Sequence, residues 1–555
     1  DLDYDLDYYV AFGAVYDDAQ QENSGENATF HTELGYIPIV NAYAISIDEV
    51  DVIYESSVTV VNPADYNLTG TAAITFTTAT IDITDNKIVH LSGSSDDMIG
   101  DATLDNIADA NTSFDFYAGV TAITYTNALN GGGTIAQDIN ATFHGIVSAD
   151  DAFNNVWVAD AEGAYNGVLI YDSGFPGQVD VGDEIIFYGI LDVYNNLTQI
   201  KNPVIIEKVS TGQTPYGPSI IAGSVIEETI TADTDPAEQW EGQLITVENA
   251  TVTVGLNASN YYYTATDDGV TTSFRIGDAV DYRLYNISLT VGDQITVTGV
   301  CDYEDGAYRI NPRSIDDIVF HYPVTFNVDM TDVAEFNPAT DEIFITGSFN
   351  GWIQPGSDAN YKLQDVGSNI YSIDLTIDEG TYNFKYFRVI SSTPSWDNGE
   401  WAGSCDRTET INSSVTLNHV WGKNNVICSA NLQWPENGSE ALGADFTAYA
   451  QILIDGVTGD VASIADLNAW IGYNSVDATT VADFETGWTW VPASMSTYVA
   501  GFGDNSQFEA NIGAVIADPG TYYYVSRFQY GTNDMVYGGY NSGYWDGVTN
   551  VSGVL

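Results

Sequence analysis

Short runs of alternating hydrophobic and polar residues recur along the whole chain. Val, Ile, Thr, Tyr and Phe alternate with polar residues in "SSVTVVNP" (56–63), "AAITFTTATIDIT" (72–84), "DQITVTGV" (293–300) and "STYVAGFGD" (496–504). A period of two places successive side chains on opposite faces, so the pattern predicts half-buried antiparallel strands separated by Gly, Asn and Asp turns. Long helical periodicity is almost absent. We therefore predict an all-β chain, a tandem array of β-sandwich and barrel domains.

The length of the chain predicts several domains. A chain of 555 residues is too long for one hydrophobic core, and usual domain sizes suggest roughly three to five cores. Hydrophobic residues make up 44% of the chain and are sufficient for packed interiors. Turn-rich stretches at 130–134, 211–219, 320–326 and 421–439 mark candidate boundaries. We predict five β-domains, the first a sandwich, at residues 1–133, 134–218, 219–321, 322–424 and 425–555.

An internal repeat links the second and third predicted domains. The segment "VDVGDEIIFYGILDVYNNLTQIKNP" (179–203) aligns with "LTVGDQITVTGVCDYEDGAYRINP" (289–312). Its Val-Gly-Asp triplet recurs, and Gly189 corresponds to Gly299 at an offset of 110. A repeat of this length indicates two copies of one domain. The turn-strand-Gly pattern resembles tandem OB-fold modules of secreted bacterial proteins over residues 134–320. Such modules bind oligonucleotides or oligosaccharides, or serve here as spacer barrels.

The charge of the chain excludes some classes of partner. The sequence has 78 Asp and Glu against 13 Lys and Arg, a formal net charge of −65, and its first 200 residues contain a single Lys or Arg, Lys87. This surface repels phosphate backbones and anionic membranes, which argues against nucleic-acid binding. Salt or bound cations relieve the self-repulsion, so a saline, calcium-containing extracellular medium suits the protein. No stretch approaches the roughly 20 apolar residues of a membrane helix, and we predict no membrane insertion.

The fourth predicted domain carries the motif with the clearest functional implication. "DEIFITGSFNGW" (341–352) precedes "GTYNFKYF" (380–387), "SWDNGEWAGSCDRTETI" (395–411) and "SVTLNHVWG" (414–422). This order resembles the starch-binding domain family (carbohydrate-binding module family twenty) over residues 322–422. The resemblance implies an Ig-like sandwich of about a hundred residues.

The same resemblance implies a glycan site. The family builds its site from a Trp at the Gly-x-Trp turn, a Lys in the following strand and a Trp six residues before an Arg. In this sequence these positions are Trp352, Lys385 and Trp401, with Arg407 as the Arg, and Trp396 is an alternative to Trp401. Flat indole rings stack on the C–H faces of α-glucan sugars, and a Lys amine donates hydrogen bonds to hydroxyls. The alternative is that these tryptophans are core or edge packing.

Three cysteines and the acidic residues raise the questions of crosslinks and metal ions. Cys405 and Cys428 are 23 residues apart, and they form either a disulfide or two buried thiols, whereas Cys301 has no evident partner. The carboxylates of "DLDYDLD" (1–7) alternate along one side of a predicted strand, where a solvated acidic edge is the simplest interpretation. The ample Asp and Asn supply leaves calcium as the candidate cofactor.

The last predicted domain resembles Ig-like modules of bacterial extracellular proteins over residues 426–555. The resemblance rests on "PGTYYY" (519–524) after an apolar strand. The domain is also rich in aromatic residues, which either pack its interior or form a second binding face. They are Trp470, Trp488, Trp490, Tyr540, Tyr544 and Trp545.

Signals of catalysis are weak. The five histidines lie at least 54 residues apart, and neither a Gly-x-Ser-x-Gly elbow nor a phosphate-binding Gly loop occurs. We therefore predict a non-catalytic protein of the bacterial cell surface or medium, in mature form after signal removal, that binds or bridges extracellular glycan. A second interpretation is a structural subunit of an extracellular filament, sheath or adhesin that forms homo-oligomers, with the modules as rigid spacers. A third is an accessory region of a larger secreted hydrolase.

Overall fold

The computed structural model divides into two compact units, Asp1–Phe320 and His321–Leu555, which we describe separately. From residue 37 onward it describes the chain except at 71–72, 94–97, 107–112, 128–134, 152–153, 232–235, 260, 268–271, 278–286, 402–404, 460, 462, 497–502 and 542. Before residue 37 it describes the backbone of β1 (Tyr8–Ala11), β2 (Val15–Tyr16), β3 (Glu22–Asn23) and β4 (Asn27–Phe30). The acidic run at 1–7 lies outside the described residues.

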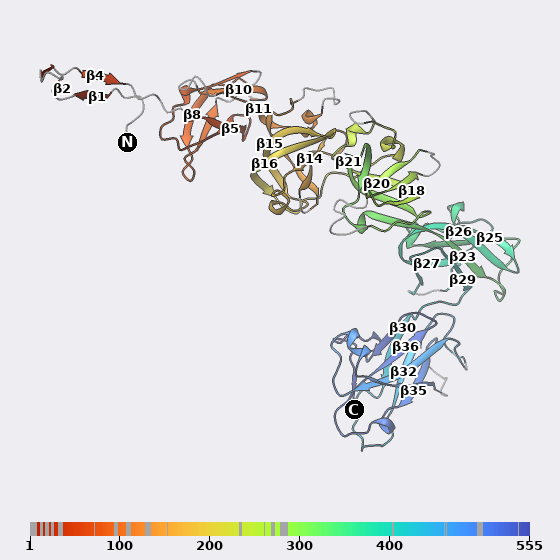
Figure 1. Cartoon of the computed structure of the whole chain (residues 1–555). Helices are drawn as coiled ribbons and strands as arrows, with labels where there is room; N and C mark the ends of the chain where they lie inside the picture. The colour runs from red at the N-terminus through yellow and green to blue at the C-terminus, as the bar shows by residue number, and fades with distance from the viewer. Residues whose placement is uncertain are drawn as a thin grey trace. The chain divides into compact units, whose positions relative to one another are not determined.

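The protein is all-β, which confirms the predicted fold class (Figure 1). Strands account for about half of the described residues, and the described helices are 3₁₀ turns of three to five residues. No helix in the described part is long and apolar enough to span a membrane. The helices are η1 (Pro63–Asp65), η2 (Ile123–Thr126), η4 (Pro176–Gln178), η5 (Gly223–Ile226), η6 (Glu238–Trp240), η7 (Ile315–Asp317), η8 (Ser348–Asn350), η9 (Ala359–Tyr361), η10 (Val481–Glu485) and η11 (Gly513–Val515).

The first domain is a seven-stranded sandwich. One sheet has the order β5-β6-β9-β8 and faces β7, β10 and β11 across a core that includes Val52, Leu91 and Phe116. This is the ABED/CFG strand order of the constant-type immunoglobulin fold. The strands are β5 (Ile39–Ala44), β6 (Glu49–Tyr54), β7 (Tyr66–Gly70), β8 (Phe76–Ile81), β9 (Ile88–Gly93), β10 (Gly100–Asn106) and β11 (Ser113–Thr121).

One predicted strand of this domain is wrong. Residues 56–63 form no strand, although their hydrophobic positions alternate. Val58 and Val61 pack against the sandwich core, while Val60 is 83% exposed. Val58 and Val60 have the same phase in the alternation but differ in burial, so in this loop the alternation corresponds neither to a strand nor to one buried face.

The second and third domains are five-stranded barrels with the same strand order. In the second the order is β13-β14-β16-β15-β12, with a β13–β12 pairing that closes the barrel and a parallel β14–β16 pair. The third repeats this as β18-β19-β20-β22-β21, closed by β18–β21, with β20 and β22 parallel. The strands are β12 (Asn140–Asp150), β13 (Asn155–Ala159), β14 (Gly167–Tyr171), β15 (Glu184–Tyr194), β16 (Leu197–Ser210), β17 (Ser219–Ile220), β18 (Leu244–Asn257), β19 (Tyr262–Asp267), β20 (Phe274–Gly277), β21 (Gln294–Glu304) and β22 (Ala307–Asn311).

The Val-Gly-Asp triplets form the same turn in both barrels. Gly182 and Gly292 have φ angles of 91° and 101°, in a region that L side chains rarely adopt. The carboxylates of Asp183 and Asp293 each accept a hydrogen bond from the backbone N–H three residues earlier, at 2.9 and 2.7 Å. The sequence repeat therefore specifies a backbone conformation.

The fourth domain is a sandwich whose core includes Phe326, Ile345 and Tyr386. Its strands follow the order β23-β26-β25-β24-β27-β28, and β29 pairs in parallel with β23. They are β23 (Ile318–Asp329), β24 (Asp341–Gly347), β25 (Lys362–Gly367), β26 (Ile370–Asp378), β27 (Gly380–Ile390), β28 (Arg407–Ile411) and β29 (Val415–Val420).

The last domain packs two sheets, β30-β31-β35-β34 and β33-β32-β36-β37-β38, around a core that includes Ile452, Ile471 and Phe528. A final strand, β39, pairs with β36. The strands are β30 (Ser429–Trp434), β31 (Thr447–Leu453), β32 (Leu467–Asn474), β33 (Thr489–Pro492), β34 (Ser494–Met495), β35 (Ser506–Asn511), β36 (Tyr523–Tyr530), β37 (Val536–Gly539), β38 (Gly543–Tyr544) and β39 (Gly553–Val554).

Candidate functional site

Lys385 lies on the outer face of the fourth domain. Strand β27 places Phe384 and Tyr386 in the core, so the alternation of a strand directs Lys385 to the opposite face. On the neighbouring strand β24, Thr346 is the register partner of Lys385. The outer face at this position is covered by the segments that follow both strands, because Thr346 Oγ1 donates a hydrogen bond to the carbonyl of Ile353 at 2.8 Å.

Trp401 is brought to Lys385 by an irregular edge segment. Glu400 donates its backbone N–H to the carbonyl of Tyr386 at 3.2 Å, and Gly399 forms a bridge with Phe387. This antiparallel pairing places Trp401 beside Lys385, whose Nζ lies 5.1 Å from the indole ring centroid. Two of the predicted site residues, 16 positions apart in sequence, are therefore in contact.

The Lys385 amine is paired within the protein. Its Nζ lies 3.0 Å from Asp406 Oδ1, and the side chain is only 8% exposed. Burial raises the pKa of Asp455 in the next domain, and the positive charge of Lys385 opposes that rise. The resemblance implies an exposed donor, whereas the structure shows a buried amine that holds the partly exposed carboxylate of Asp406.

Trp401 is half-buried and has several neighbours. The Arg407 guanidinium carbon lies 5.2 Å from its ring centroid, and the indole N–H donates a hydrogen bond to the Cys405 carbonyl at 2.7 Å. Part of the ring is therefore already engaged by cationic groups of the protein.

Trp352 and Trp396 occupy different parts of the same domain. Trp352 follows η8 with a φ angle of 56°, donates its backbone N–H to the Gly347 carbonyl at 2.9 Å and is half-buried. Trp396 is 46% exposed, with its ring edge-to-face against Phe387 at a centroid distance of 5.5 Å. Of the candidate tryptophans, Trp401 contacts Lys385, whereas Trp396 lies farther along the outer face of β27, against Phe387.

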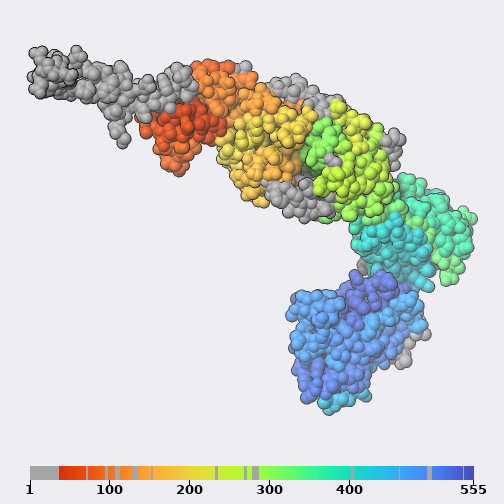
Figure 2. All heavy atoms as spheres, viewed as in Figure 1, coloured from red at the N-terminus to blue at the C-terminus, as the bar shows by residue number. Residues whose placement is uncertain are grey.

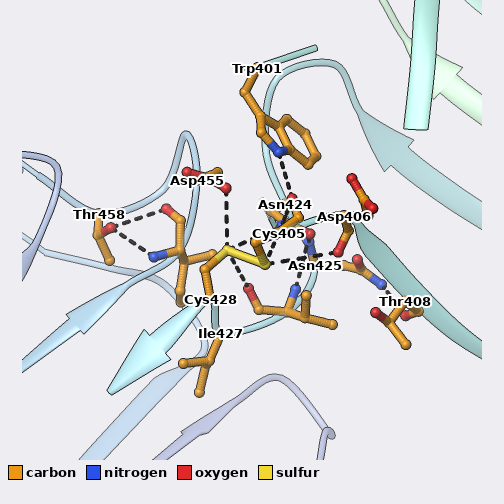
Figure 3. The surroundings of a disulfide bond; sticks show 12 residues. Trp401, Cys405, Asp406, Thr408, Asn424, Asn425, Ile427, Cys428, Asp455 and Thr458 are labelled. Atoms are coloured by element: carbon orange, nitrogen blue, oxygen red, sulfur yellow. Dashed lines mark hydrogen bonds between the residues drawn. A yellow bond between two sulfur atoms is a disulfide. The ribbon is translucent and has the colours of Figure 1, made fainter. Parts of the chain in front are cut away.

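A disulfide joins the fourth and last domains next to Trp401 (Figure 3). It connects Cys405, in the loop before β28, to Cys428, which immediately precedes β30. The Asp455 Oδ2 atom lies 3.3 Å from Cys428 Sγ, and the Asn424 amide also reaches both sulfur atoms. The sequence left open whether these cysteines form a disulfide or remain two buried thiols, and the structure contains the disulfide.

Among the described residues, the one group of His, Cys, Asp and Glu side chains close enough to share a metal ion is Cys405, Cys428 and Asp455. Both sulfur atoms of this group are used by the disulfide. No group of three or more carboxylates close enough to share one ion is assembled in the described part of the chain.

A buried ion pair beneath Trp401 is a feature that the sequence did not reveal. The side chains of Arg407 and Glu400 are 1% and 0% exposed, and Arg407 Nε donates a hydrogen bond to Glu400 Oε2 at 3.0 Å. Arg407 Nη2 also donates to the Val420 carbonyl at 2.9 Å. The sequence motif included Arg407. It did not indicate Glu400 as its partner, because one carboxylate does not stand out in a chain with 78 acidic residues.

The aromatic residues of the last domain form mainly a packed cluster. Phe484 is 1% exposed and contacts Trp488, Tyr537 and Trp545. The Arg527 guanidinium carbon lies 4.4 Å from the Trp470 ring centroid and 3.9 Å from that of Trp490. Tyr540 is buried in the main core, and Tyr544 is 42% exposed.

Trp434 is the most exposed tryptophan in the described chain, and it lies in none of the sequence motifs. Trp434 is 64% exposed at the end of β30 and lies beside Tyr449, with ring centroids 6.0 Å apart. Strand periodicity predicts that Trp434 is buried, since Ala430 and Leu432 are buried at the preceding alternate positions. A register shift between Leu432 and Trp434 reverses the face.

Comparisons with known proteins add little. No family model matches the chain, and no curated protein matches it. Among solved structures, a maltogenic amylase from S. marinus aligns with 43% of this chain and 28% of its own, at 9% identity and a TM-score of 0.14. An S-layer protein aligns with 90% of this chain and 53% of its own, at 10% identity and a TM-score of 0.13.

A third structure, an Escherichia coli adhesin, aligns with 90% of this chain and 95% of its own, at 8% identity and a TM-score of 0.14. The chain spans only about a quarter and about half of the lengths of the amylase and the S-layer protein. All three TM-scores are too low to carry an argument about function.

Proposed function

We propose that the chain is a non-catalytic, multidomain protein of the bacterial cell surface or medium that binds neutral glycan through its fourth domain. The observation that carries this proposal is the convergence of Lys385 and Trp401 on one outer face, with Trp352 on the turn after the adjoining strand. The charge of −65 supports an uncharged ligand, because anionic polymers would be repelled.

Each residue has a role in this proposal. Trp352 and Trp401 offer indole surface for stacking on sugar C–H faces. Asp406, with its side chain 28% exposed, accepts hydrogen bonds from sugar hydroxyls, and Lys385 fixes its orientation. Trp396 widens the aromatic surface along β27. A secreted location follows from the proposed ligand and from the disulfide, which persists in oxidising compartments.

Replacing Trp352 with alanine tests the proposal. We expect the full chain to be retarded in gels containing amylopectin, and Trp352→Ala to weaken that binding about tenfold, since a stacked ring contributes roughly 0.5–1.5 kcal/mol beyond its buried area. Trp352 is half-buried, so the substitution should lower the unfolding temperature somewhat, and binding is compared at a temperature where both proteins are folded.

Trp434→Ala is the matched control, because it removes an exposed tryptophan from another domain. Wild-type binding that survives Trp352→Ala and disappears in Trp434→Ala would place the site in the last domain. The absence of retardation by any neutral glucan would contradict the proposal.

A second candidate function, a stiff extracellular spacer, is favoured by the domain junctions within each unit. Strand β11 of the first domain pairs in parallel with β12 of the second, and Tyr43 stacks on Tyr188 at 3.8 Å. Tyr117, which lies inside the predicted first domain, packs in the core of the second. The Cys405–Cys428 disulfide crosslinks the last two domains. Concentration-dependent polymers in light scattering, together with no glycan binding, would favour this function.

The junction between the barrels contains buried carboxyl groups that make its stability depend on pH. Asp302 is 5% exposed and accepts a hydrogen bond from Trp157 Nε1 at 3.1 Å. Burial raises its pKa to about 7, although the Trp157 hydrogen bond and the charge of Arg309 oppose the rise. Burial likewise raises the pKa of Glu241.

Asp302→Asn should therefore stabilise the protein in a pH-dependent manner. Native Asp302 retains its proton between about pH 4 and pH 7 while the unfolded chain releases it, so wild-type stability falls as the pH rises through this range. At pH 8 we expect the variant to be more stable than the wild type by about 2 kcal/mol. This is less than the free energy that corresponds to the full pKa difference of Asp302, because the substitution also removes a negative charge near Arg309. Calorimetry at pH 4 and pH 8 checks this, and an equal gain at both values would contradict it.

A further inference from the structure

The two barrels enclose a cleft that the proposed function leaves unexplained. Its volume is about 700 Å³, within the range of about 300–1,000 Å³ that is usual for sites of small ligands. The hairpin between β15 and β16 and part of β14 form one wall, and the hairpin between β21 and β22 forms the other. The barrels abut in the space-filling view, where they are coloured yellow and green (Figure 2).

The floor of the cleft is rigidly built. Trp157, Leu169, Leu244 and Val300 form a hydrophobic cluster that joins the two barrels. The hydrogen bond from Trp157 to Asp302 lies within this contact, and both Leu169 and Asp302 also line the cleft. Because the floor is fixed by packed side chains, a ligand would meet a base that is already formed.

Two exposed tyrosines lie in the wall of the cleft that belongs to the first barrel. Tyr171 is 48% exposed and Tyr194 is 63% exposed. Barrel interiors and junctions elsewhere in this unit bury their aromatic rings, as with Phe187 and Tyr308. Rings that are left open in a cleft offer flat apolar surface for stacking, with a phenol group available for hydrogen bonding.

The polar groups of the cleft indicate the charge of the ligand. Asn195 and Asn196 are exposed in the hairpin turn, where both have positive φ angles, and Glu304 and Asp305 are exposed on the opposite hairpin. None of the thirteen lining residues is Lys or Arg, which disfavours phosphate, sulfate and carboxylate ligands. The carboxylates are also not grouped closely enough, among the described residues, to form a metal site.

We propose that the cleft between the barrels binds an uncharged oligosaccharide. Tyr171 and Tyr194 stack on sugar rings, and Asn195 and Asn196 exchange hydrogen bonds with hydroxyls. Glu304, whose carboxylate is already paired with Arg309, accepts hydrogen bonds across the cleft with its remaining exposed oxygen. The site is independent of Trp352 and Trp401, which lie in the other unit. The protein would then have two glycan sites in separate domains.

The experiment uses the full chain and affinity electrophoresis in amylopectin, laminarin, mannan and arabinoxylan, with alginate as an anionic polymer. We expect at least one neutral polymer to retard the chain, and Tyr171→Ala/Tyr194→Ala to weaken that binding tenfold or more. Tyr194→Trp should retain binding, because it keeps a stacking surface. Tyr261→Ala is the matched control, since Tyr261 is 40% exposed in the same pair of barrels.

The outcomes separate this site from the one in the fourth domain. Loss in the tyrosine variant supports the cleft, whether or not Trp352→Ala also weakens binding. Loss in Trp352→Ala alone supports the proposed function and overturns the cleft proposal. Binding of alginate or calcium that depends on the two tyrosines, or no neutral polymer bound at all, also overturns it. Both tyrosines are exposed, so an unchanged unfolding temperature should accompany the loss.

Discussion

Arg407→Met is expected to lower the free energy of unfolding of the His321–Leu555 unit by about 3–5 kcal/mol. The Arg407 and Glu400 side chains are 1% and 0% exposed, so neither charge can be rehydrated when its partner is removed. Glu400 Oε2 also accepts a hydrogen bond from the Tyr386 backbone N–H at 3.1 Å, and Oε1 accepts one from Gly422 at 3.1 Å. In the variant a carboxylate held by these bonds must remain charged in the interior or become protonated.

The double variant Arg407→Met/Glu400→Gln separates the cost of an unpaired charge from the value of the pair. Glutamine removes the unpaired charge and keeps an oxygen for one of the two backbone donors, but its NH2 group cannot accept from the other. We therefore expect the double variant to recover part of the stability lost by Arg407→Met. The matched control is Lys362→Met, because Lys362 and its partner Glu342 are about one-third exposed and such pairs contribute about 0–1 kcal/mol. Urea unfolding measures all three. An Arg407→Met cost no greater than that of Lys362→Met would contradict the prediction.

Loss of the Cys405–Cys428 crosslink is the second large expected effect. The bond closes a loop across 23 positions, and its removal should lower the free energy of unfolding by about 3 kcal/mol, mainly by enlarging the unfolded ensemble. Local order should also decrease, since the Cys405 carbonyl accepts the Trp401 indole hydrogen bond. Calorimetry with and without a reductant, and of Cys405→Ala/Cys428→Ala, measures the change.

Cys301 provides the control for this experiment. Its thiol is fully buried in the third domain and burial raises its pKa, so it should resist alkylation in the native protein. A Cys301→Ala variant should keep the full response to reductant. If reductant leaves the unfolding of the wild-type protein unchanged, the stabilising role of the crosslink is wrong.

The two large effects meet at one place in the molecule. Arg407, Trp401 and Cys405 lie within seven residues of each other, and Lys385 contacts the same indole ring. Lys385 and Trp401, two of the residues that resemble a glycan site, therefore also lie beside the junction between the last two domains. Glycan binding at Trp352 and mechanical coupling at Trp401 are compatible roles, and the variants above measure them separately.

The sequence alone predicted the strand content and the repeat of the barrels. Strand content follows from local alternation, which each segment carries within a few residues. The Val-Gly-Asp turn is equally local, because Gly182 and Gly292 are needed for a backbone angle that other residues rarely adopt. The prediction failed at residues 56–63, which form a loop in which the alternate positions Val58 and Val60 differ in burial.

The exposure and partners of the candidate site residues were decided only by the tertiary structure. Whether Lys385 faces solvent depends on Asp406 and on the segment that carries Trp401, and the orientation of Trp434 depends on one register shift. The cleft beside Tyr194 requires a second barrel, placed by contacts between residues more than a hundred positions apart, such as Trp157 and Asp302. Local patterns specify which face of a strand is apolar, but they do not specify what lies against the other face, because that is a property of segments distant in sequence.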